Sequence, residues 1–495
     1  MTFADWRKPH FRSTSLIANS KPSSQKKLNR SRADMGTCAS LFHSTDVDAQ
    51  TLHRRVRPSD QQYEAQKAEW NSLRDFIVEG LKEDTGLAIN SWLQGSYKFG
   101  TQIRPSKKGE QFDIDLGIYA GWAGKCTEGP IGPRELKEKV HSLLQVYASE
   151  ADDGRCEVME PKERCNRIQI GDDFHIDTPC YHLDQAQDAR NLATQSDEWE
   201  ASDPKAIYLW WRDSFPEEFR PRARRIVQYF KMWAALTFED GSRPSSVMLT
   251  VLVGQAMHSI DADGLSGDDE WFAAVVSHLS DEVELGCVPN PVDKGENLNR
   301  LSADQTNAIK SALSVLAEIS NRALNADNKW VASEIWSEAF QQFFPIPDEP
   351  VIKENAGAIV QFNFDPQVSV RAVPRGSGTA GITGVNRIGP IPRNCEIYFE
   401  LSNSDTLPPN SKVKWTVRNQ GADAEDENDL GHAAGFGYKA QESSAYIGTH
   451  YMDVSVWQYG SLIGRRRVPV EISGHKMPPR NAPKPNWVKF RSRRR

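Results

Sequence analysis

Residues 112–119, FDIDLGIY, place two aspartates inside an apolar run. Apolar side chains occupy every second position of the run: Phe112, Ile114, Leu116 and Ile118. This period of two predicts a β-strand that packs its apolar side chains on one face and presents Asp113 and Asp115 together on the other. Two like charges on such a strand are costly unless a cation lies between them. The stretch therefore predicts a half-buried strand with a cation site on its polar face.

A second strand is expected in FHIDTPCYH, at residues 174–182. The same alternation puts Phe174 and Ile176 in the core, and His175 and Asp177 on the polar face. If this strand lies beside the first, three carboxylates converge, and oxygen ligands of this kind suit Mg²⁺ or Mn²⁺ rather than zinc. Two such ions about 4 Å apart can activate an attacking hydroxyl and hold a leaving pyrophosphate. The predicted metal ligands, which are also the predicted catalytic residues, are Asp113, Asp115 and Asp177.

A phosphate-binding element is predicted shortly before the first strand, at Gly95 and Ser96 in LQGSYKFG. Glycine lets the backbone come close to a phosphate, and a serine at the start of a helix offers a hydroxyl and amide N–H groups. A Gly-Ser pair alone carries little information, and a D-x-D pair alone is also common on exposed strands and turns. Their combination with a third aspartate on a second strand indicates a nucleotide site beside divalent ions.

Helical and strand periods alternate in the first half of the chain. Residues 58–81 carry apolar side chains at helical spacing, another helix is expected after Pro133, and a further strand is expected at residues 167–170. Residues 185–345 have mainly helical patterns. This order predicts a mixed α/β core that is followed by a helical lobe.

The last third of the chain has a different pattern. Prolines end the helical region, and the glycine-rich stretch RGSGTAGITGVNRIGP, from Arg375, is typical of a linker. From Arg393 onward, short strands separated by turn residues predict a small all-β sandwich. The predicted parts are a flexible basic segment at 1–50, a catalytic core at 51–184, a helical lobe at 185–350 that completes the active site, a linker at 351–390, a β-sandwich at 391–474 and a basic tail at 475–495.

Composition limits the classes of protein that fit this chain. The net charge of −7 over 495 residues argues against a molecule that binds nucleic acid over its whole surface. No apolar run approaches the roughly 20 residues of a membrane span. Seven cysteines without a C-x-x-C pair, and the lack of an apolar signal-peptide core, predict reduced thiols and a cytoplasmic location. The basic ends are expected to be solvated tails, with a polyanion-binding arm as the alternative.

The order of these motifs resembles the nucleotidyltransferase superfamily, whose pattern is hG[GS], then Dh[DE]h, then a later h[DE]h on a polymerase-beta-like core. The five residues at matching positions are Gly95, Ser96, Asp113, Asp115 and Asp177. The stretches QGSYKFGT, FDIDLGIY, RRIVQYFKMW, RPSSVMLTVL and NPVDKGENLNRL are similar to the bacterial cGAS/DncV-like nucleotidyltransferases of the SMODS type, over residues 50–345. Residues 390–473 resemble the adenylyl/guanylyl and SMODS C-terminal sensor domain by strand pattern and position.

The resemblance implies a metal-dependent enzyme that makes a cyclic di- or trinucleotide second messenger for bacterial antiphage signalling. It implies ATP and GTP, or another NTP, as substrates, two Mg²⁺ or Mn²⁺ ions, and a downstream effector reached through the product. It implies no activation by nucleic acid, whereas the expectation of no membrane partner rests on the lack of a long apolar run. It also implies that Lys231 contacts the donor triphosphate and that Ser245 or Ser246 hydrogen-bonds it. A lysine is a compact point charge suited to phosphate, although Lys231 could also extend along an apolar surface to reach solvent.

Other residues have less specific patterns. Tyr97 is expected to be a packed tyrosine, with base stacking as the alternative. Asn297 and Asn299 in GENLNR are expected to be structural. Five residues lie close enough in the sequence to suggest zinc, but their spacing fits no ligand template: Cys156, Cys165, His175, Cys180 and His182.

Three alternative functions remain open from the sequence. The same core could transfer nucleotides to RNA ends or protein side chains. It could also bind nucleotides without catalysis, or the basic ends could bind nucleic acid that activates the enzyme. The bases used, the ring size, the linkage and the activating signal do not follow from these motifs.

Overall fold

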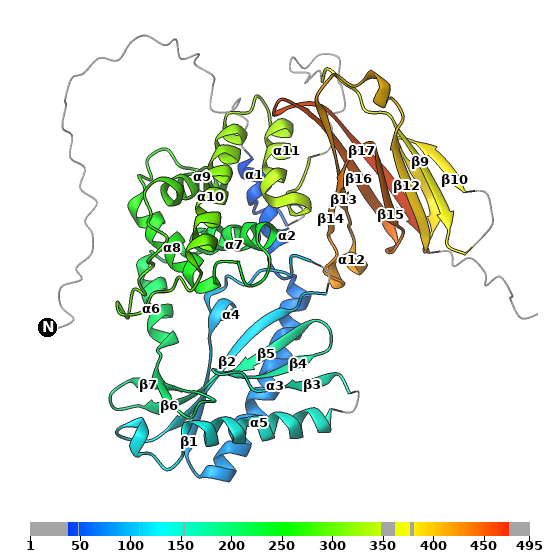
Figure 1. Ribbon diagram of the computed structural model, residues 1–495. Coiled ribbons are helices and arrows are strands. Elements are labelled where there is room, and N and C mark those ends of the chain that lie inside the picture. Colours follow the sequence, from blue (N-terminus) through cyan, green and yellow to red (C-terminus); the bar gives the residue numbers. More distant parts are fainter. Residues whose placement is uncertain are drawn as a thin grey trace, which may run out of the picture. The chain divides into compact units, whose positions relative to one another are not determined.

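A computed structural model of the chain describes residues 38–474, apart from residues 48, 108, 152–153, 348–361 and 377–380 (Figure 1). The predictions for the basic segment before residue 38 and for the basic tail at 475–495 lie outside the described residues. Within the described part, every helix is too short or too polar to cross a membrane.

The predicted catalytic core is built on a mixed sheet of eight strands. Their bounds are β1 Ala88–Leu93, β2 Phe112–Gly121, β3 Cys156–Met159, β4 Asn166–Ile170, β5 Phe174–Thr178, β6 Cys180–Asp184, β7 Ala189–Ala193 and β8 Trp199–Ala201. β5 and β6 continue one another across Pro179 and pair in parallel with β2 in one register, while β1 pairs antiparallel with β2. The predicted strand at residues 112–118 therefore lies in the sheet beside the second predicted strand.

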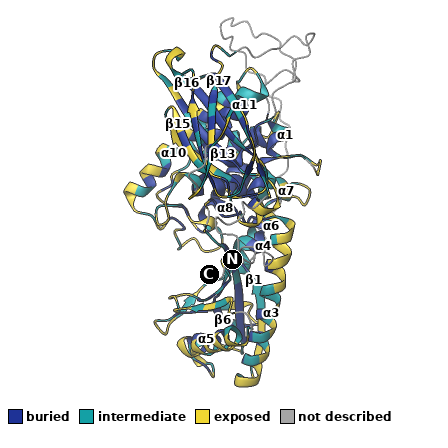
Figure 2. Ribbon diagram, turned by 90° about the vertical axis from the view of Figure 1, so that its right-hand side faces the viewer, coloured by how far each residue is buried: buried dark blue, intermediate teal, exposed yellow. Residues whose placement is uncertain are grey.

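Two long helices pack on the apolar face of this sheet. Helix α3 (Asp60–Thr85) begins at a capping box formed by Ser59 and Gln62, and α5 (Pro133–Glu150) begins with proline in its first turn. Their buried leucines, isoleucines and valines join those of β2 and β5 in one cluster. Figure 2 shows the opposite side of α3 exposed to solvent. The polar face of β2 is thus left free of these two helices.

The helical lobe is formed by α6 Pro204–Ser214, α7 Arg220–Thr237, α8 Ser246–Ser259, α9 Asp268–Asp281, α10 Ala303–Leu324, α11 Lys329–Phe340 and the short η2 Gln341–Phe343. These helices share a second apolar cluster. The predicted start of the lobe at residue 185 is wrong, because β7 and β8 precede α6 and pair with the core sheet. Strands of five and three residues are too short to show a clear period in the sequence.

The segment before α3 is packed rather than flexible where the structure describes it. Helices α1 (Ala39–Phe42) and α2 (Leu52–Val56) contribute buried residues to the cluster of the helical lobe. Phe42 is fully buried, and its ring makes edge contacts with Tyr229 and Trp336 at centroid distances of 5.3 and 5.0 Å. The prediction of a flexible segment over 1–50 is therefore wrong for residues 38–42. A helix of four residues has no periodic signal, and only tertiary packing orders it.

The C-terminal domain is a sandwich of two sheets around its own apolar cluster, as predicted. One sheet has the order β10-β9-β12-β15 and the other the order β11-β17-β16-β13-β14. The strands are β9 Val368–Pro374, β10 Ile382–Val385, β11 Ile388–Pro392, β12 Cys395–Leu401, β13 Ser411–Arg418, β14 Gly431–Phe436, β15 Lys439–Ser443, β16 Gly448–Gln458 and β17 Ser461–Ser473. The remaining short helices are η1 Cys126–Glu128, η3 Ser404–Thr406 and α12 Ala422–Asp426.

The predicted linker at 351–390 is wrong for most of its described residues. β9 pairs with β12 over seven residues, β10 pairs with β9, and β11 pairs with β17. Glycine is needed there because the backbone comes close to its neighbours: a Cβ on Gly384 would lie 2.0 Å from the carbonyl oxygen of Arg387. Close backbone approach requires glycine as much as flexibility does, so the composition alone did not distinguish the two.

A buried polar network joins the sandwich to the helical lobe. The Arg418 guanidinium donates to Asp453 at 2.7 Å and to the carbonyl oxygens of Gln342 and Phe344, at the end of the lobe. Arg418 and Asp453 are each 5% exposed. Removing one partner of such a network would leave an uncompensated buried charge, so the network holds the two domains together.

Candidate active site

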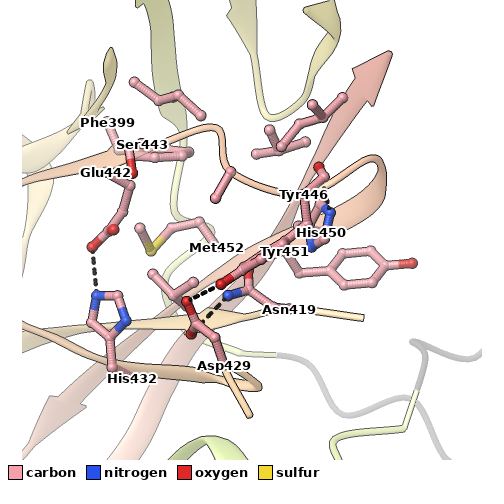
Figure 3. Close-up of a pocket in the computed structure, with 15 residues that line it drawn as sticks. Phe399, Asn419, Asp429, His432, Glu442, Ser443, Tyr446, His450, Tyr451 and Met452 are labelled. Atoms are coloured by element: carbon pink, nitrogen blue, oxygen red, sulfur yellow. Dashed lines mark hydrogen bonds and ion pairs between the residues drawn. The ribbon is translucent and has the colours of Figure 1, made fainter. Parts of the chain in front are cut away.

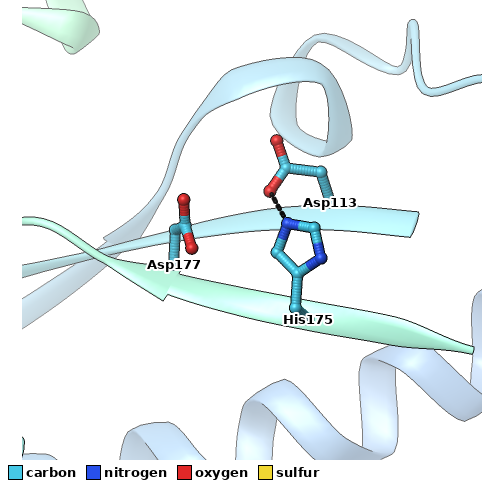
Figure 4. Close-up of side chains that lie close together, drawn as sticks. All are labelled: Asp113, His175 and Asp177. Atoms are coloured by element: carbon cyan, nitrogen blue, oxygen red, sulfur yellow. Dashed lines mark ion pairs between the residues drawn. The ribbon is translucent and has the colours of Figure 1, made fainter. Parts of the chain in front are cut away.

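The pairing of β2 with β5 places the predicted acids on adjacent strands. Asp113 lies opposite His175 in the register, and Asp115 lies opposite Asp177. One carboxylate oxygen of Asp113, one of Asp177 and a ring nitrogen of His175 all lie within 4.8 Å of one another (Figure 4). The predicted neighbourhood of the two strands is confirmed, and the Asp113 and Asp177 carboxylates are close enough to share a cation.

His175 is a contact of Asp113 that the sequence placed on the right face without giving it a role. Its Nε2 lies 2.9 Å from Oδ1 of Asp113 (Figure 4). Burial alone would raise the pKa of Asp113, but the hydrogen bond from His175 and the charge of Arg167 outweigh it and lower the pKa. Asp113 is therefore held in its charged form.

Arg167 on β4 holds Asp177 in a bidentate ion pair. Its Nε lies 2.5 Å from Oδ1 and its Nη2 lies 2.8 Å from Oδ2 of Asp177, which is 8% exposed. The thiol of Cys165 lies 3.4 Å from the same Oδ2. The sequence analysis missed Arg167, although a signal exists: in NRIQI the residue alternates with Ile168 and Ile170 and so falls on the acidic face.

Asp115 lies against the Gly-Ser element. Gly95 has a φ of +54°, and a Cβ built on it would lie 1.8 Å from Oδ2 of Asp115. The backbone N–H of Gln94 donates to the carbonyl of Asp115 at 2.8 Å. Burial, and then the charges of Asp113 and Asp177, raise the pKa of Asp115 to about 8. The proximity of the three acids thus contributes to the shift, after burial.

Helix α4 (Gly95–Phe99) starts at this glycine, so the first turn of the helix faces the acids. Gln94, which precedes it, is fixed by Tyr119 and Tyr181: its Nε2 donates to one phenol oxygen at 2.8 Å, and its Oε1 accepts from the other at 3.1 Å. The two tyrosine rings stack at 4.8 Å. This support beneath the Gly-Ser turn was not predicted from the sequence.

Lys231 on α7 reaches the same place from the helical lobe. It is 5% exposed, and its Nζ donates to the carbonyl and the hydroxyl oxygen of Thr101 at 3.2 and 3.3 Å. Burial lowers the pKa of Lys231 to about 8, although Asp115 and Asp113 act against the shift. Its ammonium group is therefore buried near the acids, which does not fit the alternative of a lysine extended into solvent.

Ser245 and Ser246 stand at the start of α8. The hydroxyl of Ser245 caps the helix by accepting from the backbone N–H of Met248 at 3.3 Å, and Ser246 is the first helical residue. The N-terminus of a helix presents free N–H groups and a partial positive charge, which favour an anion.

One cavity of about 600 Å³ unites most of the predicted site residues. It is lined by Gln94, Gly95, Ser96, Phe99, Thr101, Asp113, Asp115, Pro204, Ile207, Lys231, Ser245, Ser246, Val247, Thr250 and Arg300. Asp177 is not among these lining residues; it pairs with Arg167, whose guanidinium also lies 4.0 Å from Asp113. Arg300, which pairs with Glu296 at 3.0 Å and is largely exposed, adds a cation at the rim that the sequence analysis did not single out.

The less specific predictions can be compared with the structure as well. Tyr97 is 7% exposed and stacks on Tyr63 at 4.9 Å, which supports a packed tyrosine. The amides of Asn297 and Asn299 hydrogen-bond to neighbouring backbone, which supports a structural role. Among the residues described, the one group that could hold a metal ion contains Asp113, His175 and Asp177, so the cysteines suggested for zinc do not form a site there.

Comparison with known families agrees with this geometry. Residues 89–181 match the family model described as cyclic GMP-AMP synthase DncV-like, nucleotidyltransferase domain. Residues 356–473 match the adenylyl/guanylyl and SMODS C-terminal sensor domain, which begins well before the boundary predicted at residue 391. Two segments of the chain thus match the two domains that the sequence predicted, in the predicted order, and the predicted resemblance and fold class are confirmed.

Individual relatives extend over most of the chain. A cyclic GMP-AMP synthase of Escherichia albertii is 27% identical over 443 residues, which cover 88% of this chain and 96% of that protein. A c-di-GMP synthase of Roseivirga ehrenbergii is 27% identical over 296 residues, covering 52% of this chain and 75% of that protein. The crystal structure of Vibrio cholerae DncV cyclic AMP-GMP synthase in complex with the linear intermediate 5′ pppA(3′,5′)pG has a TM-score of 0.52 at 22% identity, over 63% of this chain and 97% of that one. This structural similarity shows that the chain shares the fold of that protein.

Proposed function

We propose that this protein is a metal-dependent nucleotidyltransferase that joins nucleoside triphosphates into a cyclic oligonucleotide and releases pyrophosphate. The observation that carries the proposal is the pairing of β2 with β5, which sets Asp113, Asp115 and Asp177 on adjacent strands. Asp113 and Asp115 line a cavity together with a Gly-Ser turn, a buried lysine and a helix N-terminus. The relatives named above, which make cyclic dinucleotides, support the class of product.

The three acids fit divalent cations. All their donor atoms are carboxylate oxygens, and the charges of Asp113 and Asp177 add to burial in raising the pKa of Asp115. The positive side chains near the acids are Arg167, Lys162 and Lys231, with His175 as a hydrogen-bond partner of Asp113. Asp113, Asp115 and Asp177 would hold Mg²⁺ or Mn²⁺. When bound, two such ions neutralise the charge that develops on the reacting phosphate and assist the attacking hydroxyl.

The reaction starts with the ribose hydroxyl of an acceptor nucleotide. Asp177 accepts its proton while the oxygen forms a bond to the α-phosphorus of a second NTP. Each carboxylate oxygen has two lone pairs, so Asp177 can accept a proton while Arg167 still orients it. The bond from the α-phosphorus to the bridging oxygen breaks with its electron pair on pyrophosphate, and Asp177 then passes its proton to water. A last such step within the linked product closes the ring.

The remaining residues act on the phosphates. Ser96 and the start of α4, Lys231, and Ser245 or Ser246 at the start of α8 surround the cavity from three sides, where the donor triphosphate binds. Donors that are already in place need no reorganisation as charge moves to the leaving pyrophosphate. Positioning and charge neutralisation thus account for most of the catalysis.

The expected substrates are ATP and GTP or another NTP. We propose that the cyclic product acts as a second messenger on a downstream effector in bacterial antiphage signalling, and that nucleic acid is not required for activity. The sequence similarity to cyclic dinucleotide synthases supports a cyclic product. The cytoplasmic location stays a prediction.

The test is incubation of the full chain with all four NTPs and Mg²⁺ or Mn²⁺, followed by measurement of pyrophosphate and mass spectrometry of the products. We expect a small, phosphatase-resistant product. The double substitution Asp113→Ala and Asp115→Ala should abolish pyrophosphate release while the circular dichroism spectrum is unchanged. Asp405→Ala, which changes an exposed acid of the C-terminal domain, is the matched control.

Different outcomes would identify a different function. Activity retained in the double variant would refute the assignment of the acids. Label transferred to added RNA or protein, without a small product, would identify a macromolecular transferase. Tight NTP binding without pyrophosphate release would identify a nucleotide-binding module, and stimulation by duplex DNA or RNA would show a nucleic-acid-activated enzyme.

A further inference from the structure

The C-terminal sandwich contains a cavity at the side where its chain crosses between the two sheets. β14 is the edge strand of one sheet and β15 the edge strand of the other, and a short turn connects them. The cavity of about 100 Å³ is lined by residues of both sheets, including these two edge strands (Figure 3). His432 on β14 and Glu442 on β15 form an ion pair at 2.9 Å, which links the two edges. The side chain of His432 is half exposed, so this pair lies at the rim of the cavity.

The walls combine an apolar body with a few polar groups. The buried apolar lining consists of Ile397, Phe399, Val417, Met452, Val470 and Ile472. The polar side contains Asp429, whose carboxylate accepts from the Nδ2 of Asn419 at 3.1 Å and from the hydroxyl of Tyr446 at 2.8 Å (Figure 3). Both of these donors are uncharged, so the negative charge of Asp429 is not neutralised by them. Few polar groups converging in an apolar pocket are typical of small-molecule sites.

The charges of the lining restrict the ligand. Among the described residues, its carboxylates are Asp429 and Glu442, its titratable nitrogens belong to His432 and His450, and no lysine or arginine lines it. Burial lowers the pKa of His450, which keeps that ring neutral. The hydrogen bond with Glu442 raises the pKa of His432, so the charge of His432 is already paired within the lining. A cavity without an unpaired cation is a poor site for a phosphate, so NTPs and the cyclic product do not fit it. Its volume of about 100 Å³ is below that of an engineered cavity of about 150 Å³ that binds benzene, so the interior encloses less than one ring, and a one-ring ligand extends into the open rim.

We propose that this cavity binds a small, non-phosphorylated molecule with a compact apolar body and an ammonium or amidinium group. The cation pairs with Asp429, and the apolar body lies against Phe399 and Met452. The site lies far from the acids in the sequence and uses none of the residues of the active-site cavity.

The wall of this cavity is connected to the catalytic strand by hydrogen bonds. Asn428, next to Asp429, accepts from the Nε2 of Gln62 in the first turn of α3 at 2.9 Å. One turn further along α3, Gln66 accepts from the Nε2 of Gln102 at 2.9 Å. The same Nε2 donates to the backbone carbonyl of Asp113 at 3.2 Å. Gln66 and Gln102 are 1% and 6% exposed.

A cation that pairs with Asp429 therefore contacts a segment whose preceding residue, Asn428, is hydrogen-bonded to α3. Helix α3 is in turn hydrogen-bonded to Gln102, which donates to the strand of the catalytic acids. The structure assigns the cavity the role of an effector site that changes the rate of nucleotidyl transfer. This second part rests on the function proposed above, whereas the binding itself does not.

Binding is tested on the full chain with benzamidine, which carries an amidinium on one ring, and with benzoate as the control of opposite charge. Saturation-transfer NMR should show benzamidine bound and benzoate unbound. Asp429→Asn, which removes the charge but keeps the shape, should abolish the benzamidine signal. Asp405→Asn, an exposed acid in η3 of the same domain, should leave the signal unchanged. Equal binding of both compounds, or benzamidine binding that survives Asp429→Asn, would overturn the proposal.

The coupling is tested by the initial rate of pyrophosphate release with and without saturating benzamidine. In the wild type we expect a change of about fivefold or more, the lower end of usual allosteric couplings. Gln62→Ala should still bind benzamidine but lose the change in rate, whereas Gln61→Ala, an exposed neighbour on α3, should respond as the wild type does. Binding to the wild type without a change in rate would refute the coupling alone. A wild type that releases no pyrophosphate would refute the proposed function and leave the binding result standing.

Discussion

Replacing Gly95 by alanine tests how closely the phosphate element and the acids must approach. The new Cβ would lie 1.8 Å from Oδ2 of Asp115, whereas real Cβ atoms essentially never come closer than 3.0 Å. The carboxylate would have to move by about 1.2 Å to restore that contact, or the turn would have to open by as much. In addition, the φ of +54° at this position is unfavourable for alanine.

The two effects differ in size and in what they change. The backbone penalty for alanine is about 1 kcal/mol of folding free energy. A displacement of about 1 Å in a reacting group can lower the rate about a hundredfold, which corresponds to about 2.7 kcal/mol of transition-state stabilisation. We therefore expect Gly95→Ala to fold with a modest loss of stability and to release pyrophosphate about a hundredfold more slowly.

Gly86→Ala separates these effects. Gly86 ends α3 with a φ of +69°, and a Cβ there would meet no atom within 4 Å, so this variant has the backbone penalty without the collision. Thermal unfolding followed by circular dichroism should give similar losses for the two variants, while initial rates should fall only for Gly95→Ala. If Gly95→Ala keeps more than about a tenth of the wild-type rate, the argument from close approach is wrong.

Further predictions concern the partners that the structure revealed. Arg167→Ala should slow pyrophosphate release by on the order of a hundredfold because Asp177 loses its bidentate partner, and Arg167→Lys should recover only part of the rate because lysine lacks the planar fork. Phe42→Ala should lower the free energy of unfolding by about 3 to 5 kcal/mol, measured by urea titration, because its ring is fully buried; an unchanged midpoint would contradict the packing of α1. Asp453→Asn should cost about 3 to 5 kcal/mol at pH 7. Burial would raise the pKa of Asp453, but Arg467 and Arg418 hold the pKa well below its usual range, so its contribution is present above about pH 4 and is lost as the pH falls further; the variant should lack this acid dependence in urea titrations between pH 3 and 7. EDTA should stop pyrophosphate release by the wild type and added Mg²⁺ or Mn²⁺ should restore it, whereas activity in EDTA would contradict the divalent site.

The sequence was most informative where the physical rule is local. Alternation along a strand depends only on backbone geometry, so the shared face of Asp113 and Asp115 followed from seven residues without knowledge of the fold. The same rule put His175 and Asp177 on the polar face of the second strand. It would also have placed Arg167 there, because the alternation of NRIQI is as regular. Gly95 was recognised as a site of close approach, although the nearby atom turned out to be the carboxylate of Asp115.

Composition and short segments were poor guides to the fold. Helix α1 and strands β7 and β8 have too few residues for a period, and the glycines near residue 384 are used for close backbone approach within a sheet. In each case the segment is ordered by neighbours that are distant in the sequence. Such contacts depend on which strands and helices meet, and no window of local sequence contains that information.

Only the tertiary structure decided which side chains meet at the site. Pairing of β2 with β5 set Asp115 opposite Asp177, and pairing of β4 with β5 set Arg167 opposite Asp177. The raised pKa of Asp115 and the lowered pKa of Lys231 follow first from burial, and the two residues line the same cavity although they lie far apart in the sequence. The residue types and their faces were therefore determined by the sequence through local backbone geometry, whereas their distances and charges depend on long-range packing.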